Sequence, residues 1–506
     1  MPASLGNDSA TYMLMARHLS PFVDNDPIAS DFYHRAPFPP GFPLFLAYSG
    51  VSHDFRLAHA AVTLCFLLGL GLFFLFLRRQ GFGSTSAGLT VMVYCLSPVV
   101  WTNVLGMLSE SLYMSLTFAF LLMLPLKQNS GNWRYWGAAG LILGWLWLTR
   151  SIGVAMVLAQ TFVVFIRRLL LGEWVKPGAV ALFIAVTAQG VWQLVKPPAT
   201  HYGEAFQAIL NFLSSDPANA IYSIMVKGAI NIGSNWLSGL MLYWVEATSI
   251  QFWLGVGLGL IALCGLVYRM WQLQTDGWYL FFYLLILFIW PFPDAMSRFL
   301  FPVFPLLLFV TIYSFSVIVC KLFRLKHEER VRGLAVLLLA ILILPSLGFA
   351  VGRATYGSGA VRHPYSYISE FYQMVDIKDA KTYAQGYSDA MADMKLVALH
   401  TKPGEVVLWV KPNFLALLAG RPSRTTPKWR GDQQKFIQAV ADTGATYVYI
   451  SGVTGRGNDD GLQAMKYFSP IASPIWQKIH KSTGQLKSAL LLIKHEKLLK
   501  EVPDIM

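Results

Sequence analysis

The stretch LAHAAVTLCFLLGLGLFFLF, residues 57–76, decides the class of fold. It contains no Asp, Glu, Lys or Arg, and about 20 largely apolar residues at a rise of about 1.5 Å each form a helix long enough to cross a membrane. Arg78 and Arg79 follow closely, which is typical of the cytoplasmic end of a span. The stretch therefore predicts a transmembrane helix.

The composition of the whole chain supports this interpretation. Of its 506 residues, 55% are apolar and 13% are charged, whereas soluble domains carry about 25% charged residues; the mean hydropathy is +0.49. The net charge of +13 comes from short basic clusters between apolar runs, which indicates membrane topology and no nucleic-acid binding. The four cysteines lie in apolar runs without a Cys-x-x-Cys pair, so neither a disulfide framework nor a structural zinc site is predicted.

Other apolar runs, read with the basic clusters between them, predict about ten crossings. The run 135–166 has basic residues beyond both ends, so we expect two short helices with Arg150 near the outer turn. Residues 229–245 are apolar enough to cross, but a crossing there would put the basic loop 321–332 outside. We therefore expect 229–245 to lie in or dip into the outer interface. The remaining expected spans are 85–105, 112–126, 178–195, 252–268, 278–291, 300–320 and 334–351.

The basic clusters recur at every second connection, which predicts that the N-terminal segment and the C-terminal portion both lie outside. Residues 1–20 are polar and show neither a signal peptide nor an apolar helix. We therefore expect either that a first helix is missing from this sequence or that the start codon is placed late.

The chain divides into three predicted parts. Residues 1–56 are an outer loop with amphipathic helices and a candidate catalytic acid, residues 57–351 a transmembrane domain, and residues 352–506 a soluble extracytoplasmic domain. In the last part, strand-like pieces such as 406–410 and 447–450 alternate with helical pieces. The predicted fold is a polytopic α-helical membrane protein with a C-terminal soluble α/β domain.

Two carboxylates stand on the expected outer side. Asp8 precedes a short amphipathic stretch, so it is either an N-cap or a general base that takes a proton from an acceptor hydroxyl or amine. Glu110 stands where the outer end of one span meets the next. It either caps the following helix or faces a functional cavity, since ionisable groups at membrane depth are costly.

Four basic residues are candidate ligands for an anion. His34 and Arg35 belong to a proline-rich run, residues 33–43, which predicts either a rigid turn that presents them to an anion or a simple interfacial loop. Arg150, between two short helices, needs an anionic partner or an aqueous cavity. Arg298 either pairs with a carboxylate four residues before it, Asp294, or binds a lipid phosphate.

The sequence shows neither a Walker A motif nor a His-Glu-x-x-His motif. A group-transfer enzyme with its site outside the cell has no ready access to cytoplasmic nucleotide sugars. We therefore expect an activated donor carried by a lipid, such as a polyprenyl phosphate.

These residues resemble motifs of the GT-C superfamily of integral-membrane glycosyltransferases, in particular the branch of protein O-mannosyltransferases and the lipid A aminoarabinose transferase. The resemblance covers about the first 350 residues as an architecture. The motifs, in chain order, are Asp8-Ser9-x-x-Tyr12, Pro39-Pro40-Gly41-x-Pro43, Ser109-Glu110 and Arg298-Phe299-x-x-Pro302-x-x-Pro305.

The resemblance implies transfer of a hexosyl or pentosyl group from a polyprenyl-phosphate-linked sugar donor to a glycan, lipid or protein acceptor, in the inner (plasma) membrane and on its extracytoplasmic face. It implies a catalytic role for Asp8, with Glu110 as a second acid. It also implies that His34, Arg35 and Arg298 hold the donor phosphate, and we expect Arg150 to bind it as well. No cofactor is expected, because no clustered ligand set for a metal ion is visible, although two carboxylates could bind a divalent cation.

Two other classes of protein stay open at this stage. A transporter of lipid-linked sugars or small solutes would also place polar residues among spans, but should show paired halves and interrupted helices near the midplane. A non-catalytic membrane scaffold would let Asp8 and Glu110 face apart.

Overall fold

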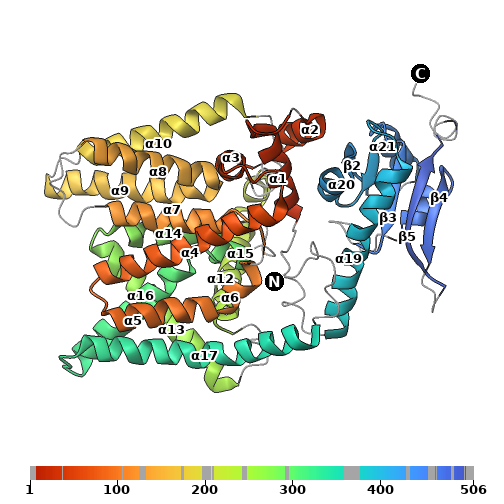
Figure 1. Ribbon diagram of the computed structural model, residues 1–506. Coiled ribbons are helices and arrows are strands. Elements are labelled where there is room, and N and C mark those ends of the chain that lie inside the picture. Colours follow the sequence, from red (N-terminus) through yellow and green to blue (C-terminus); the bar gives the residue numbers. More distant parts are fainter. Residues whose placement is uncertain are drawn as a thin grey trace.

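The computed structural model in Figure 1 describes residues 7–24, 26–36, 38–104, 106–124, 133–172, 176–196, 207, 210–241, 248–290, 296–357, 377–428, 433–453, 462, 464–479, 484–494 and 496. It is a mostly helical protein with a small sheet near the C-terminus. The helices before the sheet are α1 Asn7–Leu19, α2 Pro27–Arg35, α3 Gly41–Tyr48, α4 Phe55–Arg79, α5 Ser84–Leu96, α6 Pro98–Asn103, α7 Glu110–Met123, α8 Trp133–Thr149, η1 Ser151–Gly153, α9 Val154–Leu171, α10 Lys176–Val195, α12 Pro217–Leu240, α13 Ser249–Trp271, α14 Thr275–Phe288, α15 Met296–Leu300, α16 Phe304–Leu322, α17 Glu328–Gly357 and α19 Ile377–His400.

The chain is an integral membrane protein. Among the described residues, six helical segments are long and apolar enough to cross a membrane, and three shorter apolar helices accompany them. A helix of 14 residues, such as α7 or α14, spans only about 21 Å at 1.5 Å per residue, less than the ~30 Å hydrocarbon core. The six segments lie in α4, η1–α9, α10, α13, α16 and α17; the number of about ten crossings stays a prediction.

Two predicted spans are interrupted, and proline is the reason in both. The described part of the run 85–105 contains α5 and α6, which are separated at Ser97, whose backbone is extended. Pro98 follows, and a proline disfavours the helical conformation of the residue before it. The run 300–320 begins at the last residue of α15, and a turn that contains Pro302 separates this residue from α16.

The predicted pair of short helices in 135–166 is confirmed. α8 ends at Thr149, Arg150 adopts an extended conformation, and η1 and α9 follow. Residues 229–240 of the segment 229–245 belong to α12, which contacts α6 and α15 (Figure 1). α6 and α15 lie at the end of the bundle where α7 begins, so α12 packs across this same end.

The N-terminal helices cover this end of the bundle. α2 begins at Pro27, and the Asp26 carboxylate before it accepts hydrogen bonds from two backbone N–H groups of the first turn. α3 begins at Gly41, where a Cβ would lie 2.7 Å from backbone atoms of Leu148 and Thr149 in α8. Only glycine allows this approach, which fixes α3 beside Arg150.

The C-terminal domain contains a five-stranded sheet in the order β2-β1-β3-β5-β4. β1 is parallel to β2 and β3, and β5 is antiparallel to β3 and β4. Side chains alternate between two apolar clusters: Val407 and Trp409 face one cluster, and Leu408 faces the other. The elements of the C-terminal domain after α19 are β1 Val407–Trp409, α20 Pro412–Ala419, β2 Ser423–Thr425, α21 Gln433–Ala441, β3 Tyr447–Ser451, α22 Ala464–Phe468, β4 Ala472–Ile479 and β5 Leu486–Ile493. The predicted strands 406–410 and 447–450 are confirmed within two residues, whereas α17 continues to Gly357, beyond the predicted boundary at residue 351.

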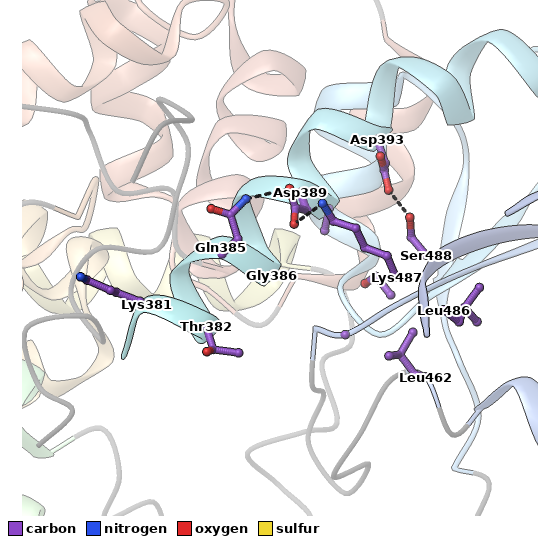
Figure 2. A pocket seen from close by; sticks show the side chains of 13 residues that line it. Lys381, Thr382, Gln385, Gly386, Asp389, Asp393, Leu462, Leu486, Lys487 and Ser488 are labelled. Carbon is purple, nitrogen blue, oxygen red and sulfur yellow. Dashed lines mark hydrogen bonds and ion pairs between the residues drawn. The ribbon is translucent and has the colours of Figure 1, made fainter. Parts of the chain in front are cut away.

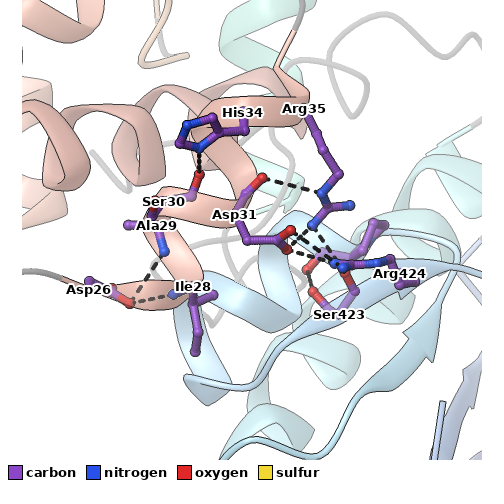
Figure 3. Close-up of polar contacts among 10 residues, drawn as sticks. Asp26, Ile28, Ala29, Ser30, Asp31, His34, Arg35, Ser423 and Arg424 are labelled. Carbon is purple, nitrogen blue, oxygen red and sulfur yellow. Dashed lines mark hydrogen bonds and ion pairs between the residues drawn. The ribbon is translucent and has the colours of Figure 1, made fainter. Parts of the chain in front are cut away.

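The C-terminal domain lies against the N-terminal helices (Figure 1). Arg424 of β2 donates to the Asp31 carboxylate of α2 at 2.6 Å, and Arg35 donates to the same carboxylate (Figure 3). Asn413 of α20 donates to the Thr11 hydroxyl of α1 at 3.0 Å. The N-terminal segment and the C-terminal domain therefore lie at one end of the bundle, as expected if both are on one side of the membrane.

Candidate functional site

Asp8 and Arg298 meet although 290 residues separate them in sequence. Asp8 lies in the first turn of α1, and its carboxylate accepts a hydrogen bond from Nη1 of Arg298 in α15. The side chains keep 29% and 21% of their surface exposed, respectively. Asp8 is therefore an accessible carboxylate held in an ion pair. Asp294, the other partner expected for Arg298, lies outside the described residues.

Glu110 connects Arg298 to the second arginine. It is the first residue of α7, and its Oε1 accepts from Nε of Arg298 and from Nη1 of Arg150. Its side chain is 1% exposed and that of Arg150 is 8% exposed. The four groups form one charge-balanced cluster in which exposure decreases from Asp8 inward to Glu110. The scaffold alternative predicted that Asp8 and Glu110 face apart, which is not what the structure shows.

The Ser109 hydroxyl links three of the surrounding elements. It accepts from Arg150 at 3.3 Å, lies 3.3 Å from the Tyr12 hydroxyl and donates to Glu110 at 3.4 Å. A serine hydroxyl has one donor and two acceptor sites, so these contacts satisfy it fully when Tyr12 donates. Burial raises the pKa of Tyr12 to about 12, although the charges of Arg298 and Arg150 lower it. Tyr12 is thus neutral at physiological pH and acts as a hydrogen-bonding group.

Three contacts fix the short helix α15 that carries Arg298. The Tyr283 hydroxyl donates to the backbone carbonyl of Phe299 at 2.7 Å, and the Asn103 amide donates to the Ser297 hydroxyl at 3.5 Å. The guanidinium of Arg150 lies 4.9 Å from the centre of the Phe299 ring, a cation–π contact. Phe299 therefore supports Arg150 through its ring and has no hydroxyl to offer.

The expectation that His34 and Arg35 join this site is not met. His34 packs against His18, at the opposite end of α1 from Asp8, with 5.8 Å between ring centres. Ten residues of helix separate Asp8 from His18, about 15 Å at 1.5 Å per residue. Arg35 pairs with Asp31 and faces the C-terminal domain (Figure 3). The sequence places His34 and Arg35 together in a proline-rich run, but α2 packs on α1 so that both side chains point away from Asp8.

Within the described part of the chain, no group of three or more His, Cys, Asp or Glu side chains lies together as a metal-binding set would. Ser109 and Phe299 also contact the cluster, although the sequence assigned neither of them a role in the site. Ser109 precedes Glu110 and Phe299 follows Arg298, within two of the quoted motifs, and this position is the signal that could have found them.

The fold and site define a polytopic membrane protein with an arginine–carboxylate cluster at the end of its bundle that faces the C-terminal domain. Solved structures similar to this chain include ArnT from Cupriavidus metallidurans, in the apo state (14% identity, TM-score 0.46) and bound to undecaprenyl phosphate (14% identity, TM-score 0.44); each match covers 97% of this chain and 94% of that chain. A further one is the archaeal oligosaccharyltransferase AglB from Archaeoglobus fulgidus in complex with an inhibitory peptide and a dolichol-phosphate, with 13% identity, a TM-score of 0.35 and coverage of 96% and 70%.

ArnT and AglB are both GT-C glycosyltransferases. No protein-family model and no curated protein sequence matches the chain. Because the TM-scores lie below 0.5, the assignment of chemistry rests on the chain's own residues.

Proposed function

We propose that this protein is a glycosyltransferase that moves a hexosyl or pentosyl group from a polyprenyl-phosphate donor to a glycan, lipid or protein acceptor. The proposal places it in the inner (plasma) membrane, with about ten crossings and with α1 and the C-terminal domain on the extracytoplasmic side. The observation that carries it is the contact of Arg298 with both carboxylates, Asp8 and Glu110. An accessible base and a cationic group beside it are the two requirements for displacing a phosphate leaving group.

The reaction is a direct displacement at the anomeric carbon. The acceptor oxygen or nitrogen bonds to C1 of the sugar while the bond from C1 to the phosphate oxygen breaks, and the electron pair leaves with the polyprenyl phosphate. Asp8 takes the proton of the acceptor. Arg298 and Arg150 neutralise the charge on the phosphate, so that electrostatic stabilisation replaces a strong acid catalyst.

Arg298 can bind the phosphate while it keeps its contacts with Asp8 and Glu110. A guanidinium has five N–H donors, and the contacts with Glu110 and Asp8 use Nε and Nη1. Nη2 therefore offers further donors to a phosphate oxygen. Arg150 is more deeply buried, so its contribution to the phosphate is mainly a fixed positive charge behind Arg298.

Glu110 takes a different role from the one that the family resemblance implies. A carboxylate that is 1% exposed and engaged by two arginines offers little surface to a substrate. We assign it the positioning of Arg298 and Arg150, and we leave proton transfer to Asp8 alone.

The test replaces Asp8 with Asn, which keeps the shape and removes the base. Mass spectrometry of polyprenyl-phosphate-linked sugars and envelope glycans is compared among cells that produce the wild type, Asp8→Asn or the control Asp26→Asn. Since general bases contribute about 10²–10⁴-fold, we expect the glycan product to fall at least about 100-fold in Asp8→Asn. Asn at position 26 still caps α2, so the control should keep wild-type product. Wild-type product levels in Asp8→Asn would show that the assignment is wrong.

A further inference from the structure

The C-terminal domain contains a cavity of about 520 Å³ outside the Asp8 cluster (Figure 2). One wall is a single face of α19, from Lys381 to Asp393, whose lining residues follow the helical repeat of three to four. The opposite wall is formed where β3 ends, at Ser451, and by the first three residues of β5, from Leu486 to Ser488. The volume falls in the range of about 300–1,000 Å³ that small-molecule sites occupy.

The polar groups of the lining alternate between donors and acceptors (Figure 2). The Gln385 amide donates to Asp389 at 2.9 Å, and Lys487 donates to the same carboxylate at 2.7 Å. Asp393, 2% exposed, accepts from the hydroxyls of Tyr449 and Ser488 and from Lys478. These bonds hold the lining in one arrangement before any ligand arrives.

Gly386 stands in the middle of α19 and lines the cavity. Glycine is the least favourable residue in a helix interior after proline. Close packing does not explain it, because among the described residues no heavy atom lies within 4 Å of the place where its Cβ would be. The missing side chain instead adds to the open space of the cavity and leaves the backbone of α19 accessible to a ligand.

The described lining carries two lysines, Lys381 and Lys487, and two aspartates, Asp389 and Asp393, so its formal charge is zero. An anion in the cavity would face the two carboxylates, and a cation would face the two ammonium groups. A neutral ligand with many hydroxyl groups meets no such opposition. Each hydroxyl donates one hydrogen bond and accepts two, which matches carboxylate, ammonium, amide and serine groups placed side by side.

We propose that this cavity binds a neutral oligosaccharide. The proposal does not depend on the reaction at Asp8, because the cavity and the cluster share no residue. It gives the C-terminal domain a glycan-binding function of its own, at the end of the bundle where the N-terminal helices lie.

The test measures binding directly. The full chain in lipid nanodiscs is applied to an array of neutral and acidic glycans and of peptides, and saturation-transfer NMR is used to measure the affinity for the glycans that it retains. We expect retention of neutral glycans and at least about a tenfold loss of affinity in Gly386→Trp, whose side chain fills the cavity. Ala392→Trp is the matched control, because Ala392 is exposed on the same helix and does not line the cavity.

Gln385→Ala and Lys487→Met provide a second line of evidence should Gly386→Trp fail to fold, since both remove a lining donor and Gln385 is exposed. Each is expected to weaken binding several-fold. Absence of any neutral-glycan binding overturns the proposal, and so does a preference for acidic glycans or peptides. Binding that all three lining variants leave unchanged would also overturn it. Product formation in the Asp8→Asn experiment is measured separately, so failure of one proposal does not obscure the other.

Discussion

Replacing Glu110 with Gln tests the central contact of the site. The amide keeps the size of the side chain but removes the charge that both arginines share. Arg298 still contacts Asp8 and remains partly exposed. Arg150 differs from Arg298, because it is only 8% exposed and Glu110 is the carboxylate with which it forms an ion pair.

The expected loss of stability follows from this asymmetry. Removing one partner of a buried ion pair costs about 3–5 kcal/mol, because the other charge is left in a medium of low dielectric constant. A partly exposed pair is worth only about 0–1 kcal/mol, so Arg298 adds little to the loss. We therefore expect Glu110→Gln to lower the free energy of unfolding by about 3–5 kcal/mol, most of it from Arg150.

The assay is denaturant unfolding in mixed micelles, combined with a second variant that removes both charges. Glu110→Gln with Arg150→Met leaves no buried unpaired charge, and such replacements are often close to neutral. The double variant should therefore recover most of the stability and none of the activity. A single variant that loses less than about 1 kcal/mol, or a double variant no more stable than the single one, would refute the reasoning.

A buried ion pair outside the site provides the matched control. Arg269 donates to both carboxylate oxygens of Asp276, at 3.0 and 2.7 Å, and the side chains are 5% and 6% exposed. Asp276→Asn should destabilise the protein by a similar amount. Because this pair is not part of the Asp8 cluster, the folded fraction should transfer sugar at the wild-type rate. The comparison separates the loss of fold from the loss of chemistry.

Two further predictions concern the surroundings of the site. Ser109→Ala removes the hydroxyl that joins Tyr12, Arg150 and Glu110. Because a hydrogen bond contributes about 1 kcal/mol, we expect the single-turnover rate to fall roughly fivefold. An unchanged rate would contradict a role of this hydroxyl in positioning the cluster. Burial raises the pKa of Asp31, but hydrogen bonds and charges of Arg424 and Arg35 outweigh it and hold that pKa below its ordinary value of 3.8. A depressed carboxyl pKa stabilises the contact above pH of about 4, and this contribution is lost as the pH falls below that value. Arg424→Gln should lower the stability of the contact between the C-terminal domain and α2 by about 0.2–1 kcal/mol at neutral pH. The variant should also lose less of this stability in acid than the wild type does. Hydrogen exchange of α20 measures both effects, and identical exchange in the variant and the wild type at pH 7 would contradict the prediction.

Most of the charged residues of the site could be selected from the sequence because their surroundings are apolar. Glu110, Arg150 and Arg298 flank or interrupt apolar runs, where a charge is costly unless it has a partner or a function. Asp8 was selected differently, as the carboxylate that precedes an amphipathic stretch near the start of the chain. The pairing could not be derived in the same way. It depends on the packing of α1 and α15, whose contacting side chains lie 290 residues apart, and no local pattern encodes that distance.

His34 and Arg35 show the limit of local reasoning from the opposite direction. Their sequence context resembles that of Arg298, because in both places basic residues stand a few positions before prolines. What separates them is the direction in which α2 packs: its last turn meets His18 and the C-terminal domain. Two strands of that domain, β1 and β3, could be predicted from the sequence, whereas the order of the sheet depends on contacts between distant segments.

Charge balance explains why one arginine should contact both carboxylates. In the proposed reaction, the donor is a phosphodiester with one negative charge, and the departing polyprenyl phosphate gains a second as the bond to C1 breaks. In the same step Asp8 takes up a proton and loses its negative charge. Negative charge thus moves from one neighbour of Arg298 to another while the total around its guanidinium stays constant. Because Glu110 already holds the guanidinium in place, the stabilisation of the phosphate can grow toward the transition state without reorganisation, which lowers the barrier more than tight binding of the donor would.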